Sequence, residues 1–250
     1  MADHNNRFSS RLTFLLSALG IAVGTGNIWR FPRIVASNAG EEGAGAFLVA
    51  WITFLFLWSI PLIIVEYIMG RQSRMGTIGA FANFMGKPFA FLGGFVGFVS
   101  TAIAFFYSVI VGWNIYYFGI ITFTDLPQTN QASLMLWSSF QNSLFPILFH
   151  GVAMTVGGLA IYKGVSSIEK VNKVLIPVLL GIVMLSVLRA ISLPGSFEGI
   201  SYLFTPDWSQ LKRPGIWVDA LAQNAFDTGA GFGLFLTYAI YIKKRYGVVK

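Results

Sequence analysis

Residues 11–37 read RLTFLLSALGIAVGTGNIWRFPRIVAS, an apolar stretch whose centre carries three glycines followed by Asn27. A second stretch, QNAFDTGAGFG at residues 223–233, again combines glycines with polar residues inside an apolar region. Glycine lets a helix break at low steric cost, and polar groups at membrane depth are costly unless they face protein, water or a ligand. The two stretches therefore predict two membrane helices that are interrupted at their centres.

The composition excludes a soluble domain. The 250 residues are 55% hydrophobic and 11% charged, with a mean hydropathy of +0.68, whereas soluble chains carry about 25% charged residues. Residues 88–124 and 126–162 each contain no Lys, Arg, Asp or Glu. There is no cysteine and there are only two histidines, so disulfides and thiolate metal sites are excluded as well. The sequence predicts an all-α integral membrane protein.

Apolar runs between Gly, Pro and charged residues predict a single membrane domain over residues 1–250. We expect six transmembrane helices, at about residues 11–37, 46–70, 89–122, 143–162, 171–191 and 216–242.

The positive charge follows the predicted topology. The net charge is +7, and 12 of the 17 basic residues lie on one alternating side of the six segments. This bias predicts that the N- and C-termini are cytoplasmic and that the protein is a multi-pass protein of the plasma (inner) membrane. The polar first ten residues lead into a full span, so no cleavable signal peptide is expected. Because topology accounts for the basic excess, no nucleic-acid partner is expected.

Residues 11–32, RLTFLLSALGIAVGTGNIWRFP, resemble the first helix of the neurotransmitter:sodium symporters, whose bacterial members include the leucine transporter. The resemblance continues through EYIMGR at 66–71, FTPDWSQL at 204–211 and residues 223–233. It implies the leucine-transporter-like fold, with the first inverted repeat of five helices plus the sixth helix, and with helices one and six broken mid-membrane. The second half of the family fold is absent from the sequence. We therefore expect a partner polypeptide, or a full-length chain, to supply it.

The resemblance also implies two sodium sites. The first would use the Ala22 carbonyl, the Asn27 side chain and Asp227, and the second would use the Gly20 and Val23 carbonyls together with ligands from a helix outside this sequence. Broken helices supply such ligands because their carbonyls lack helical partners.

For an amino-acid substrate, the resemblance implies that free amides and a tyrosine hydroxyl bind the carboxylate, and that apolar side chains line a pocket. The implied substrate-binding residues are Ala22, Thr25, Gly26, Ile103, Tyr107, Phe226, Gly229 and Phe232. Arg30 would act as an extracellular gate residue, and Glu66 would hold the first helix.

The expected function is sodium-coupled symport of a neutral, hydrophobic or aromatic amino acid by alternating access, with no enzyme activity. Gly229, where the leucine transporter has serine, leaves room for bulky substrates. Asp227, where it has threonine, would supply a balancing negative charge, and Trp51 replaces a tyrosine of the family's chloride sites, so chloride is not expected to be required. Two alternatives remain open: Asp227 pairs with an organic amine substrate, or the chain is a non-transporting scaffold or assembly partner.

Overall fold

The computed structural model describes residues 7–24 and 26–242, and all regular structure in these residues is helical. The expectation of an all-α protein is therefore confirmed. The helices are α1 (Arg11–Ala22), α2 (Phe31–Ser37), α3 (Gly45–Phe54), α4 (Ile60–Ser73), α5 (Thr77–Met85), α6 (Ala90–Phe123), α7 (Asn130–Gln141), α8 (Phe145–Ile161), α9 (Val165–Ile191), α10 (Ser196–Phe204), α11 (Pro214–Thr228) and α12 (Leu234–Ile240).

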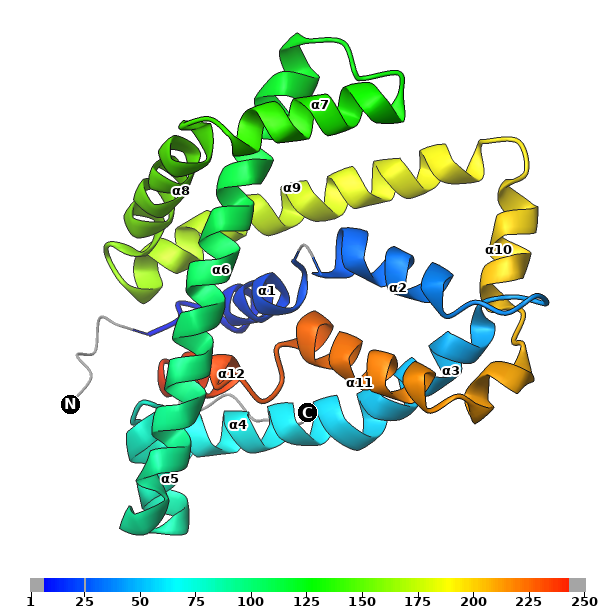
Figure 1. The fold of residues 1–250 in the computed structure, drawn as a ribbon. Coiled ribbons are helices and arrows are strands. Elements are labelled where there is room, and N and C mark those ends of the chain that lie inside the picture. Colours follow the sequence, from blue (N-terminus) through cyan, green and yellow to red (C-terminus); the bar gives the residue numbers. More distant parts are fainter. Residues whose placement is uncertain (1–6, 25, 243–250) are drawn as a thin grey trace.

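Both predicted interruptions are present. The first segment is divided between α1 and α2, with a bend of 52° between Arg11–Ala22 and Asn27–Ser37. The last segment is divided between α11 and α12 by residues 229–233. Figure 1 shows these two interrupted segments beside each other at the centre of the molecule, between α9 on one side and α3 and α4 on the other.

Two π-helical turns precede prolines, and the proline ring explains their position. The turns are η1 (Gly26–Arg30) and η2 (Leu55–Ser59), and they lie just before Pro32 and Pro61. Proline has no N–H, and its ring clashes with the carbonyl four residues earlier, here in the π-helical turn. Widening that turn relieves the clash, and such turns are frequent at functional sites.

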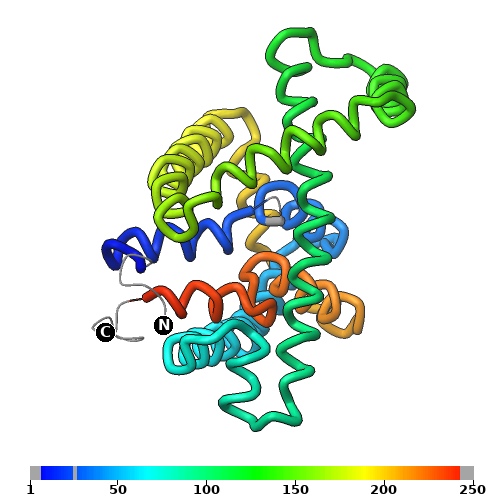
Figure 2. The backbone as a smooth tube through the Cα atoms, turned by 90° about the vertical axis from the view of Figure 1, so that its left-hand side faces the viewer, coloured from blue at the N-terminus to red at the C-terminus, as the bar shows by residue number. Residues whose placement is uncertain are grey.

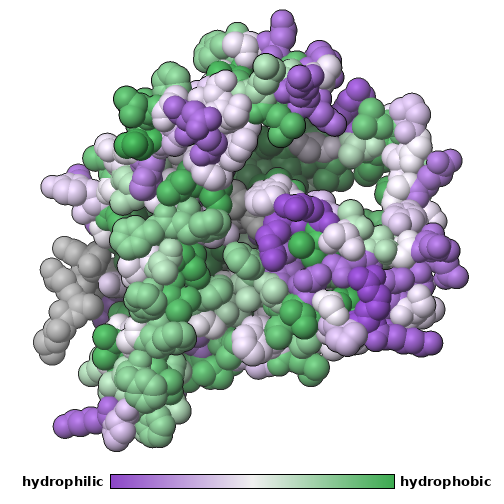
Figure 3. All heavy atoms as spheres, viewed as in Figure 1, coloured by the Kyte–Doolittle hydropathy of each residue, from purple (hydrophilic) through white to green (hydrophobic). Residues whose placement is uncertain are grey.

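Within residues 7–24 and 26–242, three helical stretches are long and apolar enough to cross a membrane: Gly45–Ser73, Lys87–Phe123 and Val165–Ile191. Two bent pairs of helices could each form one further span, namely Arg11–Ala22 with Asn27–Ser37 and Asn130–Gln141 with Phe145–Ile161. Apolar side chains cover much of the face seen in Figure 3, and hydrophilic ones gather toward its right-hand edge, near α10. This distribution is typical of a membrane domain with a polar rim.

The structure also contains helices that were not predicted. The short helices α5, α7 and α10 lie in the loops between the expected spans, and α9 begins at Val165 rather than near Val171. The earlier start has a structural reason. Glu169, in the first turns of α9, accepts hydrogen bonds from the backbone N–H and the hydroxyl of Ser9, so the charged end of the helix is held against the start of α1.

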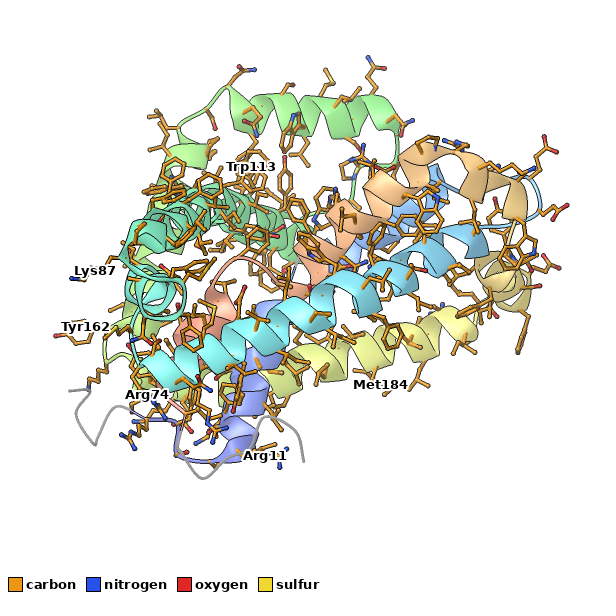
Figure 4. The ribbon with its side chains drawn as sticks, turned by 90° about the horizontal axis from the view of Figure 1, so that it is seen from below. Arg11, Arg74, Lys87, Trp113, Tyr162 and Met184 are labelled. Carbon is orange, nitrogen blue, oxygen red and sulfur yellow. The ribbon has the colours of Figure 1, made fainter. Side chains whose placement is uncertain are left out.

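One long helix forms a wall beside the interrupted segments. In Figure 2, α6 runs along one side of the molecule from the α5 end to the α7 end. It packs closely against α5 and α8. Arg74 and Lys87, which flank α5, lie at the left-hand end of the molecule in Figure 4. α6 therefore passes the two helix breaks and forms one side of the space next to them.

Candidate functional site

The side chain of Asn27 stabilises the break in the first segment by a hydrogen bond. α1 ends at Ala22, and Val23 caps it by donating its N–H to the Leu19 carbonyl at 2.7 Å. The side-chain oxygen of Asn27 then accepts the N–H of Gly24 at 3.1 Å. Asn27 thus stabilises the turn that follows the predicted ligands Ala22 and Val23 and that contains Gly26. Thr25, predicted to bind the substrate carboxylate, lies outside the described residues.

The break in the last segment depends on glycine and on one carboxylate. Gly229, Gly231 and Gly233 have φ angles of 65°, 89° and 71°, which residues with a β-carbon rarely adopt. The carboxylate of Glu66, only 7% exposed, accepts the N–H groups of Gly231, Gly233 and Leu236 at 2.7, 3.1 and 3.3 Å. The resemblance implied that Glu66 holds the first helix. In the structure its hydrogen bonds instead stabilise the break of the sixth.

A cavity of about 600 Å³ lies beside these breaks. Its wall is almost entirely apolar, which suits a ligand with a hydrophobic body. The residues that line it are Gly20, Ile21, Gly24, Ile103, Tyr107, Val111, Phe226, Gly229, Phe232 and Leu234. They come from the first segment, from α6 and from the last segment, so three separate parts of the sequence converge on one space.

Sequence reasoning found part of this wall. Five of the predicted substrate-binding residues line the cavity: Ile103, Tyr107, Phe226, Gly229 and Phe232. Gly20, predicted as an ion ligand, lines it as well. The sequence analysis missed Ile21, Gly24, Val111 and Leu234. Val111 was detectable, because it follows Ile103 and Tyr107 at four-residue spacing and so occupies the same helix face.

Asp227 is turned away from the cavity. The residue is 3% exposed and does not line the cavity. One carboxylate oxygen accepts the Gln223 amide at 2.7 Å, and the other accepts the Trp51 indole N–H at 3.2 Å. These hydrogen bonds join Asp227 to α3 and to its own helix, whereas the Asn27 side chain bonds to Gly24. In the part of the chain that the structure describes, no three His, Cys, Asp or Glu residues cluster around a possible metal position.

Arg30 connects this polar group with the cavity wall. Its guanidinium donates to the side-chain oxygen of Gln223 and lies 4.4 Å from the centre of the Phe226 ring. The contact with Phe226 is a cation–π interaction. Arg30 thus contacts one wall residue of the cavity, Phe226, and also Gln223, which donates to Asp227.

Asn224 is a buried polar residue that sequence reasoning did not single out. It is 0% exposed, and its amide nitrogen donates to the Trp51 carbonyl at 2.8 Å and to the Ala220 carbonyl at 3.1 Å. The hydroxyl of Ser59, in the π-helical turn η2, donates to its oxygen at 3.0 Å. Because a buried polar side chain without partners is costly, these contacts join the second segment to α11, both before the turn at Trp51 and within it at Ser59.

The described geometry defines a multi-pass helical membrane protein in which two interrupted helices flank a central apolar cavity. The chain belongs to the sodium:neurotransmitter symporter family, whose model matches residues 5–139 and 133–250.

Individual relatives support this assignment. An uncharacterised sodium-dependent transporter of Methanocaldococcus jannaschii is 33% identical over 248 residues, which cover 95% of this chain and 49% of the relative. The sodium-dependent neutral amino acid transporter B(0)AT2 of Bos taurus is 30% identical over 280 residues, which cover 97% of this chain and 37% of that protein.

A solved structure confirms the predicted leucine-transporter-like fold. The crystal structure of MhsT in complex with L-phenylalanine matches with a TM-score of 0.82 and 34% identity, over 96% of this chain and 54% of that one. This chain spans about half the length of MhsT and of the Methanocaldococcus protein, and less of the bovine one.

Proposed function

We propose that this chain forms part of a sodium-coupled symporter that takes up a neutral amino acid with a hydrophobic or aromatic side chain by alternating access. The observation that carries the proposal is the cavity of about 600 Å³ between the two helix breaks, with Tyr107 as its hydroxyl-bearing wall residue. Ligand pockets usually measure about 300–1,000 Å³ and combine apolar walls with a few polar groups. The family's transporters, and the phenylalanine bound in the MhsT structure, favour the same substrate class.

Substrate binding would use both ends of the amino acid. The Tyr107 hydroxyl and the amides of Thr25 and Gly26 would bind the carboxylate. The carbonyls of Ala22 and of residues 226–229 would accept from the ammonium group. Ile103, Phe226 and Phe232 would contact the side chain, with Gly229 leaving room beside it. Half-helix ends suit a zwitterion because each break presents free carbonyls at the end of one half-helix and free N–H groups at the start of the next.

Sodium is transported with the substrate, and its proposed ligands are the ones implied by the resemblance. Ala22, Asn27 and Asp227 would hold one ion, and Gly20 and Val23 would contribute carbonyls to a second. Moving one positive charge inward through a membrane potential releases about 2.3 kcal/mol per 100 mV, so two ions could drive strong accumulation. To bind an ion, Asn27 or Asp227 would have to coordinate it while also making the hydrogen bonds described above.

Chloride is proposed not to be required. The Asp227 carboxylate lies between Trp51 and Gln223, with Arg30 beyond Gln223. It would provide the negative charge that balances sodium, and the indole of Trp51 occupies a donor position next to it. The same geometry argues against an organic amine as the main substrate, because the carboxylate faces Trp51 and Gln223 rather than the cavity.

The transport cycle would require more helices than this sequence contains. Alternating access needs one helix bundle to move against another, and this chain spans about half the length of MhsT and of the Methanocaldococcus relative. We propose that the complementary helices come from a second polypeptide or from a longer chain. The assembly would lie in the plasma (inner) membrane as a single domain, with six spans from this chain and both of its termini in the cytoplasm.

The decisive experiment measures binding of radiolabelled L-phenylalanine to the purified chain in lipid, in sodium and in choline buffer, with and without the complementary helices. We expect saturable, sodium-dependent binding when the complementary helices are present. Tyr107→Phe should weaken it about tenfold, since one hydrogen bond to a charged group is lost. Val178→Ala, at an exposed position on α9, is the matched control and should bind normally.

Competition separates the remaining possibilities. Displacement by L-leucine and L-tryptophan, but not by glycine or phenethylamine, supports the proposed substrate class. Strong displacement by phenethylamine would favour the amine. Absence of sodium-dependent binding with the complementary helices present would favour the scaffold function instead.

A further inference from the structure

Helix α6 presents two different faces one residue apart. Ile103, Tyr107 and Val111 line the cavity. Ser108 and Gly112, each one residue further along, face α8. Successive residues in a helix are offset by about 100°, so the orientation of the cavity face is set by how the neighbouring face is held.

The two helices meet at a backbone contact. A β-carbon at Gly112 would lie 2.8 Å from the backbone nitrogen of His150 and 2.9 Å from the carbonyl carbon of Phe149. Gly112 is buried, and α6 and α8 pack extensively against each other (Figures 1 and 2). The contact lies one turn from Ser108, so α6 has little freedom to shift at this level.

A polar contact accompanies it. Nε2 of His150 lies 2.9 Å from the hydroxyl oxygen of Ser108, and that hydroxyl donates to the Phe105 carbonyl at 2.7 Å. The tautomer with the proton on Nε2 lets both contacts form at once: Nε2 donates to the Ser108 oxygen while the hydroxyl proton goes to the Phe105 carbonyl. The result is a continuous chain of hydrogen bonds from α8 to the backbone of α6.

His150 is an unusual residue for its surroundings. It is the one titratable side chain in residues 126–161. An ionisable side chain inside such a stretch is costly unless it has a function. Simple helix packing would explain the Gly112 contact, but it does not require an imidazole that hydrogen-bonds the residue next to Tyr107.

We propose that His150 is a positioning residue for substrate recognition: through Ser108 it fixes the rotation of α6 and so aims the Tyr107 hydroxyl into the cavity. The proposal rests on the proposed role of Tyr107 in binding the substrate carboxylate. Side chains end about 5–6 Å from a helix axis, so a rotation of about 10° moves their ends by about 1 Å. Such a displacement is enough to lose a hydrogen bond.

The first test measures thiol labelling and needs no substrate. The chain contains no cysteine, so each introduced thiol is the only one in its variant. Tyr107→Cys and Leu234→Cys each place one thiol on the cavity wall, the first on α6 and the second on α12. The rate of labelling by a small methanethiosulfonate reagent is compared with and without His150→Leu. We expect His150→Leu to change the rate at position 107 about fivefold and to leave position 234 unchanged. Equal changes at both positions, or none at either, would overturn the proposal.

His150→Gln is the conservative control, because its amide keeps an N–H donor at similar reach. In this variant the cysteine at position 107 should be labelled at the same rate as when His150 is present. Ser108→Ala removes the acceptor without altering α8, and should reproduce the effect of His150→Leu. If His150→Leu does not fold, these two variants still decide the question: a normal rate in Ser108→Ala would contradict the positioning role.

The second test uses L-phenylalanine binding. His150→Leu should weaken binding about fivefold in the wild-type background but have little further effect in Tyr107→Phe, because the two residues act through one interaction. Additive losses would overturn the proposal. If the wild-type assembly binds no amino acid, the proposed function fails, and the thiol labelling still shows whether His150 orients α6.

Discussion

The indole N–H of Trp51 donates a 3.2 Å hydrogen bond to one carboxylate oxygen of Asp227, which joins the second segment to the last turn of α11. Gln223 donates to the other oxygen at 2.7 Å, and Arg30 in turn donates to Gln223. Two neutral donors thus hold the nearly buried Asp227 carboxylate, and the Arg30 cation contacts one of these donors, Gln223. This arrangement can supply a fixed charge beside the cavity without placing it inside.

The first prediction concerns this charge. Replacing chloride by gluconate should leave sodium-dependent uptake by the complete assembly unchanged, because we propose that Asp227 supplies the balancing charge. Asp227→Asn should reduce uptake at least about tenfold, because removing one charge from a buried polar group costs more than about 1.4 kcal/mol. Asp219→Asn is the control, because Asp219 lies on the same helix and accepts from Asn38 instead. Loss of sodium-dependent uptake by the wild-type assembly in gluconate would refute the proposed role of Asp227.

The second prediction concerns the break between α11 and α12. Glu66→Gln should lower the free energy of unfolding by about 2 kcal/mol, because an amide replaces a carboxylate that accepts three backbone N–H groups. Thermal unfolding in detergent measures the effect. Glu198→Gln, at an exposed position on α10, is the matched substitution and should leave the melting temperature nearly unchanged. Similar melting of both variants would show that Glu66 does not stabilise the break.

The third prediction compares two adjacent glycines on α6. A β-carbon at Gly93 would lie 2.5 Å from the Thr77 carbonyl oxygen, whereas one at Gly94 would meet nothing within 4 Å. Gly93→Ala should therefore force α5 and α6 apart and cost about 1–3 kcal/mol of stability. Gly94→Ala should be neutral or stabilising by up to about 1 kcal/mol, since alanine favours the helix. Unfolding midpoints of the pair measure the difference, and equal midpoints would contradict the close contact.

The fourth prediction is a pH dependence outside the membrane-spanning helices. Asp207, in the loop before α11, accepts the hydroxyl of Ser209 at 2.6 Å and its backbone N–H at 3.0 Å. The hydroxyl bond, aided by the backbone bond and opposed by burial, holds the pKa of Asp207 below its ordinary value. Because the folded-state pKa is lower than the unfolded one, the carboxylate adds stability at neutral pH, and this stability is lost as the pH falls through the folded pKa.

Asp207→Asn should therefore lower the melting temperature at pH 7, and the difference from wild type should shrink below about pH 4. Melting curves across this range provide the measurement. Ser209→Ala should produce a smaller shift with the same pH trend. A difference that stays constant with pH would show that Asp207 stabilises the loop by shape and not by charge.

The two helix breaks could be predicted from local sequence alone. Glycines at 20–26 and at 229–233, with polar neighbours, are enough to interrupt an apolar helix, and the structure has both interruptions. Pro32 and Pro61 similarly account for the π-helical turns, although the sequence analysis did not predict those turns. The short helices α5, α7 and α10 were missed because they lie outside the long apolar runs on which the prediction rested.

Partners of buried polar groups could not be predicted in this way. Glu66 was expected to hold the first helix, and Asn224 was not singled out, because their partners lie in segments distant in sequence. These partners are Gly231, Gly233 and Leu236 for Glu66, and Trp51 and Ser59 for Asn224. Hydrogen bonds of this kind depend on how the helices pack.

The sequence by itself determined that this is a helical membrane protein with two interrupted segments, because hydropathy, glycine and proline act locally along the chain. It also identified, through the family motif, six residues of the cavity wall: five predicted to bind substrate, and Gly20, predicted to bind an ion. Only the tertiary structure decided that Asp227 faces Trp51 and Gln223, that Glu66 holds the last segment, and that His150 contacts the residue beside Tyr107. Those relationships join helices far apart in the chain, and the direction of each side chain is fixed by the packing of its helix against the others.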